Sequence, residues 1–160
     1  MTALHTLGVA DMATLIRRRD ASPVEIVNAC LERSEALDPT IQAWATLDRQ
    51  GAMAAAKRCE AALQGGADVG PLAGVPVGLK DIIYTAGLRT AAGSRVYANF
   101  VPAYDATVTT RLRQAGAIVL GKTVTTEFAT ADPSPTRNPW NTAHTPGGSS
   151  SGSAAAVAAG

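Results

Sequence analysis

Two features of the sequence could do chemistry together: Lys80 and the serine run at residues 149–151. A serine hydroxyl becomes a nucleophile when a base takes its proton, and a neutral lysine amine can be that base. A second hydroxyl between base and nucleophile could relay the proton, because hydroxyls both donate and accept. Desolvation by apolar neighbours would favour the neutral amine. The apolar residues near Lys80 in the sequence are Val75, Val77, Leu79, Ile82 and Ile83.

Simpler interpretations of both features stay open on spacing alone. Lys80 could be an exposed lysine at the end of a strand, paired with Asp81 or another acid. The serine run could belong to a flexible linker, as many Gly/Ser tracts do. The alanine-rich stretch AAAVAAG that follows weakens the linker interpretation, because it is a good helix former and the serines precede it where an N-cap is expected.

Two further patterns match known motifs but lack the context that those motifs need. Residues 116–123, GAIVLGKT, fit the phosphate-loop pattern, yet the four residues between the glycines form a strand themselves, so we interpret Lys122 as a solvated strand-end lysine. Residues 148–152 fit the nucleophile-elbow pattern GxSxG, but no apolar strand precedes them. The histidines, His5 and His144, both come before the motif, so a Ser-His-Asp triad is not expected.

The elements that must position Lys80 and the serines are helices and short strands. Ser22, Pro23 and Glu25 form a capping-box pattern, and Asp38-Pro39 is expected to end the helix that it starts. In the strand that ends near Lys80, Val75, Val77 and Leu79 point one way and Pro76, Gly78 and Lys80 the other. The expected helices are 7–16, 23–38, 48–63 and 105–115, the expected strands are 41–47, 75–80 and 117–121, and 132–145 is an expected loop.

Composition narrows the class of protein. The chain has 160 residues, a length that is enough to bury a core. Its net charge is +1, and 17% of its residues are charged and 46% hydrophobic, a composition too apolar for a disordered chain. The low charge argues against nucleic acid as the main partner. Arginines 17–19 are expected to be a solvated helix end, where the helix dipole favours cations. Neither a signal peptide nor a membrane-spanning run is found, so a cytoplasmic location is expected. Cys30 and Cys59 are expected to be buried free thiols.

Three segments closely resemble the amidase signature family. They are GVPVGLKDII at 74–83, ATVTTRLRQAGAIVLGKTVTTEFAT at 106–130 and TRNPWNTAHTPGGSSSGSAAAVAAG at 136–160. The similarity runs in register over essentially the whole chain. It implies an α/β/α sandwich around a mixed β-sheet, incomplete in this chain, and an enzyme that hydrolyses carboxamides, or transfers their ammonia, without a cofactor or metal.

The resemblance also implies roles for individual residues. Lys80 corresponds to the general base of the family's Ser-cisSer-Lys triad, and Ser149 to the cis-serine that relays protons. Gly147, Gly148 and Ser150 correspond to the loop that supports the cis-serine. The implied substrate is a small-molecule amide, with no membrane and no direct nucleic-acid partner.

In this family the acylated serine follows the cis-serine, at a place beyond Gly160. The chain is therefore expected to be one incomplete domain, with an N-terminal helical segment at 1–66 and the start of the catalytic core at 67–160, and to be inactive alone. The rest of its own chain or a homodimer partner would complete it. Residues 125–128, TTEF, resemble the small-amide and aryl-amide members more than the A subunit of a transfer-RNA-dependent amidotransferase, which is the alternative. A non-enzymatic structural or binding remnant is the third hypothesis.

Overall fold

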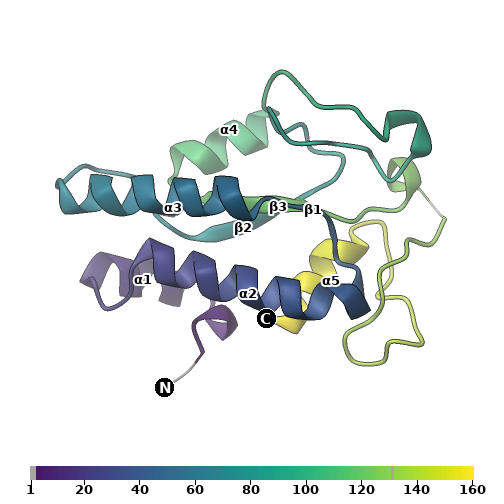
Figure 1. Ribbon diagram of the computed structural model, residues 1–160, viewed down its shortest axis with the longest axis horizontal. Helices are drawn as coiled ribbons and strands as arrows, with labels where there is room; N and C mark the ends of the chain where they lie inside the picture. Colours follow the sequence, from purple (N-terminus) through teal and green to yellow (C-terminus); the bar gives the residue numbers. More distant parts are fainter. Residues whose placement is uncertain (1–2, 131) are drawn as a thin grey trace.

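A computed structural model describes residues 3–130 and 132–160 of the chain and shows a mixed α/β fold (Figure 1). Its α-helices are α1 (Val9–Arg18), α2 (Pro23–Ile41), α3 (Arg49–Gln64), α4 (Thr107–Gln114) and α5 (Ser151–Ala159). Its strands are β1 (Trp44–Leu47), β2 (Pro76–Lys80) and β3 (Ile118–Thr123). The short 3₁₀ turns are η1 (Leu4–Thr6), η2 (Arg95–Tyr97) and η3 (Glu127–Ala129).

The strands form a mixed sheet in the order β1-β3-β2, which confirms the expected sheet type. β3 lies in the middle, and its run of apolar residues is typical of a buried central strand. It pairs antiparallel with β1 and parallel with β2. A parallel pair needs a crossover connection, and the chain between β2 and β3, which includes α4, supplies it.

The register between β2 and β3 separates two lysines. Lys80 lies opposite Thr123, and Leu79 lies opposite Lys122. Paired residues point to the same face of a sheet and successive residues to opposite faces. The Lys80 and Thr123 side chains therefore share one face, and the Leu79 and Lys122 side chains share the other, as the alternation in the sequence predicts for β2.

The core is built from α2 and α3 against the central strand. The two helices run side by side in Figure 1, in front of the strands. The buried residues of this cluster are Val27, Leu31, Ala52, Ala56, Ile118 and Leu120. The alanines allow the helix backbones to approach closely, while full burial of a side chain such as Leu31 contributes roughly 2 kcal/mol.

Helix α5 packs on β2 and β3 with small residues at the contact. A Cβ atom on Gly152 would collide with the Ala43 carbonyl oxygen and the Val124 nitrogen, so only glycine fits there. Ala155 is fully buried one turn later. The end of the helix is fixed to α2 by Arg33, whose Nε donates to the Ala159 oxygen at 2.9 Å, and the C-terminus lies beside α2 (Figure 1).

The predicted starts of α2 and α3 are confirmed, whereas α1 and α4 each begin two residues later than expected, at Val9 and Thr107. The Ser22 hydroxyl accepts from the Glu25 N–H at 3.1 Å, and the Glu25 carboxylate accepts from the Ser22 N–H at 2.8 Å, which is the predicted capping box. The Asp48 carboxylate caps α3 by accepting from the Gly51 N–H at 2.9 Å. Arg19 takes a left-handed conformation at the end of α1, so the arginine run does end that helix.

The predicted end of α2 is wrong by one turn. The helix continues through Pro39 to Ile41, which leaves only Trp44–Leu47 for the strand expected at 41–47. The Asp38 carboxylate ends the helix instead. It accepts from the Ala43 N–H at 2.7 Å and from the Trp44 N–H at 3.0 Å, the first residues after the helix cap.

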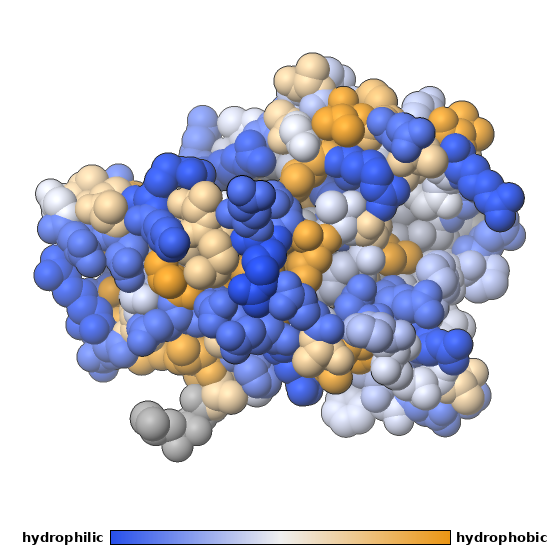
Figure 2. Space-filling model, in the orientation of Figure 1, coloured by the Kyte–Doolittle hydropathy of each residue, from blue (hydrophilic) through white to orange (hydrophobic). Residues whose placement is uncertain are grey.

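The surface in Figure 2 is largely hydrophilic over α2 and α3, with apolar patches over the segment between β2 and α4. None of the helices described by the structure combines the length and apolar character needed to span a bilayer. Cys30 and Cys59 are free, as expected, but half-buried rather than buried. Partial burial still raises the pKa of the Cys30 thiol to about 11, so this thiol stays protonated at neutral pH.

Candidate functional site

The fold brings Lys80 and Ser149 together, although they lie far apart in the sequence. Lys80 is the last residue of β2, and Ser149 lies in the turn before α5. The Lys80 Nζ donates to the Ser149 Oγ at 2.6 Å. Both side chains are half-buried, so the pair is held by the protein and remains open to a third group.

The turn that presents Ser149 has unusual backbone geometry. The peptide bond between Gly148 and Ser149 is cis, as the family resemblance implies. Gly147 has a φ of 89°, a left-handed conformation that glycine adopts without strain. The Gly147 N–H donates to the Thr145 hydroxyl at 3.2 Å, and the Ser149 carbonyl accepts from the Thr126 N–H at 3.1 Å. The first bond closes the turn on itself, and the second ties it to the chain that leaves β3.

The neighbouring serines lie in different surroundings. Ser150 is exposed and occupies the N-cap position of α5, but its side chain makes no capping hydrogen bond. Ser151 is buried, and its Oγ accepts from the Ser134 Oγ at 2.6 Å. Of the serine run, only Ser149 contacts Lys80 in the described structure.

A pocket of about 400 Å³ opens beside Ser149. Among the described residues, none of the side chains that line it is charged, so a neutral group fits its chemistry. Ala129, at its wall, has a φ of 58°, and Phe128 before it has a φ of 46°, so the chain bends sharply there. The lining residues are Thr126, Ala129, Thr130, Pro133, Thr145, Gly147, Gly148 and Ser149.

The interpretation of Lys122 as a solvated lysine is wrong. Its side chain is fully buried on the sheet face opposite Lys80. Its Nζ donates to the Ile83 carbonyl at 2.5 Å and to the Thr90 hydroxyl at 2.6 Å. Residues 81–94 fold over this end of the strand and exclude water, which a pattern of strand residues alone does not reveal. Burial lowers the pKa of Lys122 to about 8.

The expected apolar surroundings of Lys80 are also not found. Leu79 is buried on the opposite face of the sheet, and Ile82 is 38% exposed. Lys80 does not pair with Asp81 either, since that carboxylate turns away and accepts from the Ala91 N–H at 3.1 Å. Within the described residues, Lys80 makes its side-chain hydrogen bond to the Ser149 hydroxyl.

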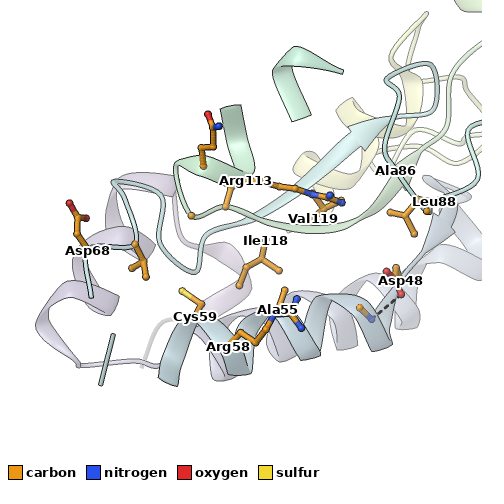
Figure 3. A pocket seen from close by; sticks show the side chains of 16 residues that line it. Asp48, Ala55, Arg58, Cys59, Asp68, Ala86, Leu88, Arg113, Ile118 and Val119 are labelled. Atoms are coloured by element: carbon orange, nitrogen blue, oxygen red, sulfur yellow. Dashed lines mark hydrogen bonds between the residues drawn. The ribbon is translucent and has the colours of Figure 1, made fainter. Parts of the chain in front are cut away.

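A larger pocket, of about 680 Å³, lies away from this pair, between α3, α4 and β3 (Figure 3). Arg113 at its rim already pairs with Asp105 at 2.8 Å. Cys59 also lines it, and partial burial raises the pKa of this thiol, so it is a poor nucleophile. The described residues of this pocket therefore hold no evident base and nucleophile pair.

Sequence reasoning missed a second hydroxyl pair on the Lys80 face. The Thr123 Oγ1 and the Ser153 Oγ lie 2.7 Å apart and join β3 to α5. Direct pairing of the two predicted strands would place Lys122 opposite Lys80, because the register shift between Val77 and Gly78, which brings Thr123 there instead, is not part of that prediction. The position of Ser153 depends on the packing of α5, which has no sequence signal of its own.

Comparison with known proteins identifies the relatives of this arrangement. The family model described as Amidase matches residues 25–160. The A subunit of glutamyl-tRNA(Gln) amidotransferase from Roseiflexus sp. (strain RS-1) is 45% identical over 100% of this chain and 34% of its own length. Its counterpart from Carboxydothermus hydrogenoformans is 44% identical over 98% of this chain and 34% of its own length. The chain thus spans about a third of the length of these curated relatives.

Solved structures agree with this placement. Native peptide amidase from Stenotrophomonas maltophilia superposes with a TM-score of 0.88 at 38% identity, over 94% of this chain and 33% of that one. The 6-aminohexanoate cyclic dimer hydrolase superposes with a TM-score of 0.85 at 32% identity, over 97% of this chain and 32% of that one. The family match over most of the chain, together with the shared fold, shows that this protein belongs to the amidase (amidase signature) family.

Proposed function

We propose that this chain supplies the base and the proton relay of an enzyme that cleaves a carboxamide C–N bond through a serine acyl-enzyme. The observation that supports the proposal most directly is the 2.6 Å contact between the Lys80 Nζ and the Ser149 Oγ. Such a contact suits proton transfer, because it is within hydrogen-bond reach and a hydroxyl can donate and accept at once.

In this mechanism Lys80 acts as the base: its amine takes the Ser149 proton while Ser149 takes the proton of the attacking serine. The serine oxygen forms a bond to the amide carbon, and the C–N bond breaks as the proton returns through Ser149 to the leaving nitrogen. Water then hydrolyses the acyl-enzyme and restores the serine. The uncharged pocket beside Ser149 is where we place the amide group.

We propose that the attacking serine lies outside residues 1–160, in the part of the protein that completes the active site. The serines next to Ser149 do not suit that role: Ser150 is exposed without a base, and Ser151 is buried against Ser134. Base and relay without nucleophile would give no acyl-enzyme, so the 160-residue chain alone should be inactive.

The experiment is an ammonia-release assay on the protein with and without the residues that follow Gly160, using small aliphatic, aryl and peptide amides. The proposal predicts ammonia release from at least one amide by the longer protein and none by residues 1–160. A longer protein that is folded and releases no ammonia from any amide, alone or with partner subunits, would contradict it.

A second candidate function is that of an amidotransferase component that delivers the released ammonia to a misacylated transfer RNA. The curated relatives at 44–45% identity carry the name of the glutamyl-tRNA(Gln) amidotransferase, which supports this candidate over a free small-amide hydrolase. Glutamine as the best ammonia donor and co-purification with partner subunits would favour it. Hydrolysis of aryl amides by the isolated protein, with glutamine a poor substrate, would favour the free amidase.

A further inference from the structure

The segment that follows Lys80 is fixed to the sheet by two buried charged residues, Asp81 and Lys122. Asp81 is 1% exposed and Lys122 is 0% exposed. Burying charged groups is expensive, and well-packed hydrophobic residues of similar volume often replace a buried pair of opposite charges without loss of stability. The fold alone therefore does not require charge at this place.

Both residues hold the backbone directly after Lys80. The Asp81 N–H donates to the Thr123 carbonyl at 2.9 Å, and its carboxylate accepts from the Ala91 N–H. From the other strand, Lys122 binds the carbonyl of Ile83 and the hydroxyl of Thr90. The turn is closed by the Ile83 N–H, which donates to the Lys80 carbonyl at 2.8 Å.

We infer that Asp81 and Lys122 are positioning residues for Lys80: together they clamp the 81–83 turn and residues 90–91 onto the end of the sheet, and so keep the Lys80 amine at hydrogen-bond distance from Ser149. This inference rests on the proposed function. Neither residue touches the reacting atoms, since Lys122 lies on the opposite face of the sheet and the Asp81 carboxylate bonds to Ala91.

The clamp acts through geometry. Lys80 is the last residue of β2, so the strand fixes its backbone only on the N-terminal side, and the turn must fix the other side. A long side chain magnifies any rotation of its backbone, and misplacement of a catalytic group by about 1 Å can cost about 100-fold in rate. Loss of the clamp should therefore lower the rate of the chemical step and leave substrate binding in the pocket beside Ser149 nearly unchanged.

The test is steady-state kinetics of amide hydrolysis by the complete enzyme carrying Lys122→Met, with Lys57→Met as the matched control. Lys57 is exposed on α3 and is not one of the residues that form the clamp, so its replacement should change nothing. For Lys122→Met we expect kcat to fall by about 100-fold with little change in KM. An unchanged kcat, or a fall that appears only as a higher KM, would overturn the inference.

A double-mutant cycle separates positioning from a general loss of structure. If Lys122 acts through Lys80, adding Lys122→Met to Lys80→Ala should lower the residual rate very little, because the side chain that it positions is gone. The same fractional loss in both backgrounds would overturn the inference. If Lys122→Met fails to fold, Thr90→Val is the second variant, because it removes only one hydrogen-bond acceptor of Lys122. It should lower kcat by less than about 100-fold, while the Lys57→Met control keeps the wild-type kcat. Wild-type kcat in a folded Thr90→Val would then overturn the inference.

The Lys80→Ala variant also distinguishes a failed inference from a failed function. If Lys80→Ala is nearly inactive and Lys122→Met is fully active, Lys80 is catalytic and the clamp is not needed, which overturns the inference alone. If Lys80→Ala is itself fully active, the base is elsewhere, and both the proposed function and the inference are overturned.

Discussion

Two lysines lie at the same end of the sheet, and the structure gives them opposite surroundings. Lys80 ends β2 on one face, half-buried, with its amine against the hydroxyl of Ser149. Lys122 lies one register position away on β3, on the other face, fully buried between a carbonyl and a hydroxyl. The residue type and the strand position are nearly the same, so the segments that cover each face decide what each lysine can do.

The two lysines differ in whether their hydrogen-bond partner borders a pocket that a substrate could enter. The hydrogen-bond partners of Lys122 in the described structure, the Ile83 carbonyl and the Thr90 hydroxyl, hold a side chain that is fully buried and closed to substrate. Lys80 contacts a hydroxyl that also borders a pocket of about 400 Å³. A base must reach a reacting proton directly or through one relay, and of these two lysines only Lys80 meets that condition.

Of the two lysines, replacement of Lys80 should have the larger effect on catalysis, and the largest of all the effects predicted here. Lys80→Ala in the complete enzyme should lower kcat/KM for amide hydrolysis by roughly 10²–10⁴-fold, the range of a general base, while the circular dichroism spectrum stays unchanged. Lys57→Ala on the exposed face of α3 is the matched control and should retain full activity. A Lys80→Ala enzyme with near-normal turnover would remove this lysine from the mechanism.

Loss of the relay should be the next largest effect. Ser149→Ala removes the hydroxyl that contacts Lys80 and that the proposed mechanism uses as the relay, so kcat should fall by about 100-fold or more. Ser153→Ala removes a hydroxyl of the same kind on α5 that bonds to Thr123 instead, and it should change kcat little. Equal effects of both substitutions would show that Ser149 acts through the packing of α5 and not through its contact with Lys80.

The burial of Lys122 should make the free energy of unfolding depend on pH. Burial lowers the pKa of Lys122 to about 8 in the folded protein, whereas an unfolded lysine titrates near about 10.4. Between these values the unfolded chain binds more protons, so the free energy of unfolding rises with pH by roughly 3 kcal/mol from this group.

Urea unfolding of the wild type and of Lys122→Met, compared between about pH 7.5 and about pH 10.5, measures this contribution. The rise with pH should be smaller by that amount in Lys122→Met and unchanged in Lys57→Met. The same rise in wild type and Lys122→Met would mean that Lys122 titrates as an exposed lysine does.

The smallest effect concerns the second hydroxyl pair on the Lys80 face. Thr123→Val keeps the shape of the buried side chain but removes its bond to Ser153, which should lower the free energy of unfolding by about 1 kcal/mol. Because Thr123 neighbours Lys80 without contacting Ser149, kcat should stay within about two-fold of the wild type. A large loss of activity in a stable Thr123→Val protein would extend the proton path beyond Lys80 and Ser149.

Local signals predicted much of the fold. The capping box at Ser22 and Glu25 and the cap at Asp48 form through hydrogen bonds within a few residues, so the sequence contains the whole interaction. The β2 alternation likewise predicts which face Lys80 occupies. The predicted end of α2 is wrong because Pro39 lies inside the helix without ending it, and the Asp38 carboxylate ends the helix later by accepting from the N–H groups of residues 43 and 44.

The two lysines show where local signals stop. The family resemblance assigned Lys80 and Ser149 their roles, and the structure places these residues in contact across 69 positions of sequence. The burial of Lys122 was missed because it depends on residues 81–94 folding back over β3, a long-range event without periodicity. The predicted apolar surroundings of Lys80 are wrong for a related reason. Leu79 is next to Lys80 in the sequence but packs on the opposite face of the sheet.

The most direct test of the account is to map the serine that becomes acylated. The complete enzyme would be treated with a serine-directed fluorophosphonate, digested and analysed by mass spectrometry, beside its Lys80→Ala and Ser149→Ala variants. The account predicts one labelled serine outside residues 1–160, with labelling much slower in both variants than in Lys57→Ala. A label on Ser149, or on any serine within residues 1–160, would contradict the assignment of Lys80 and Ser149 as base and relay.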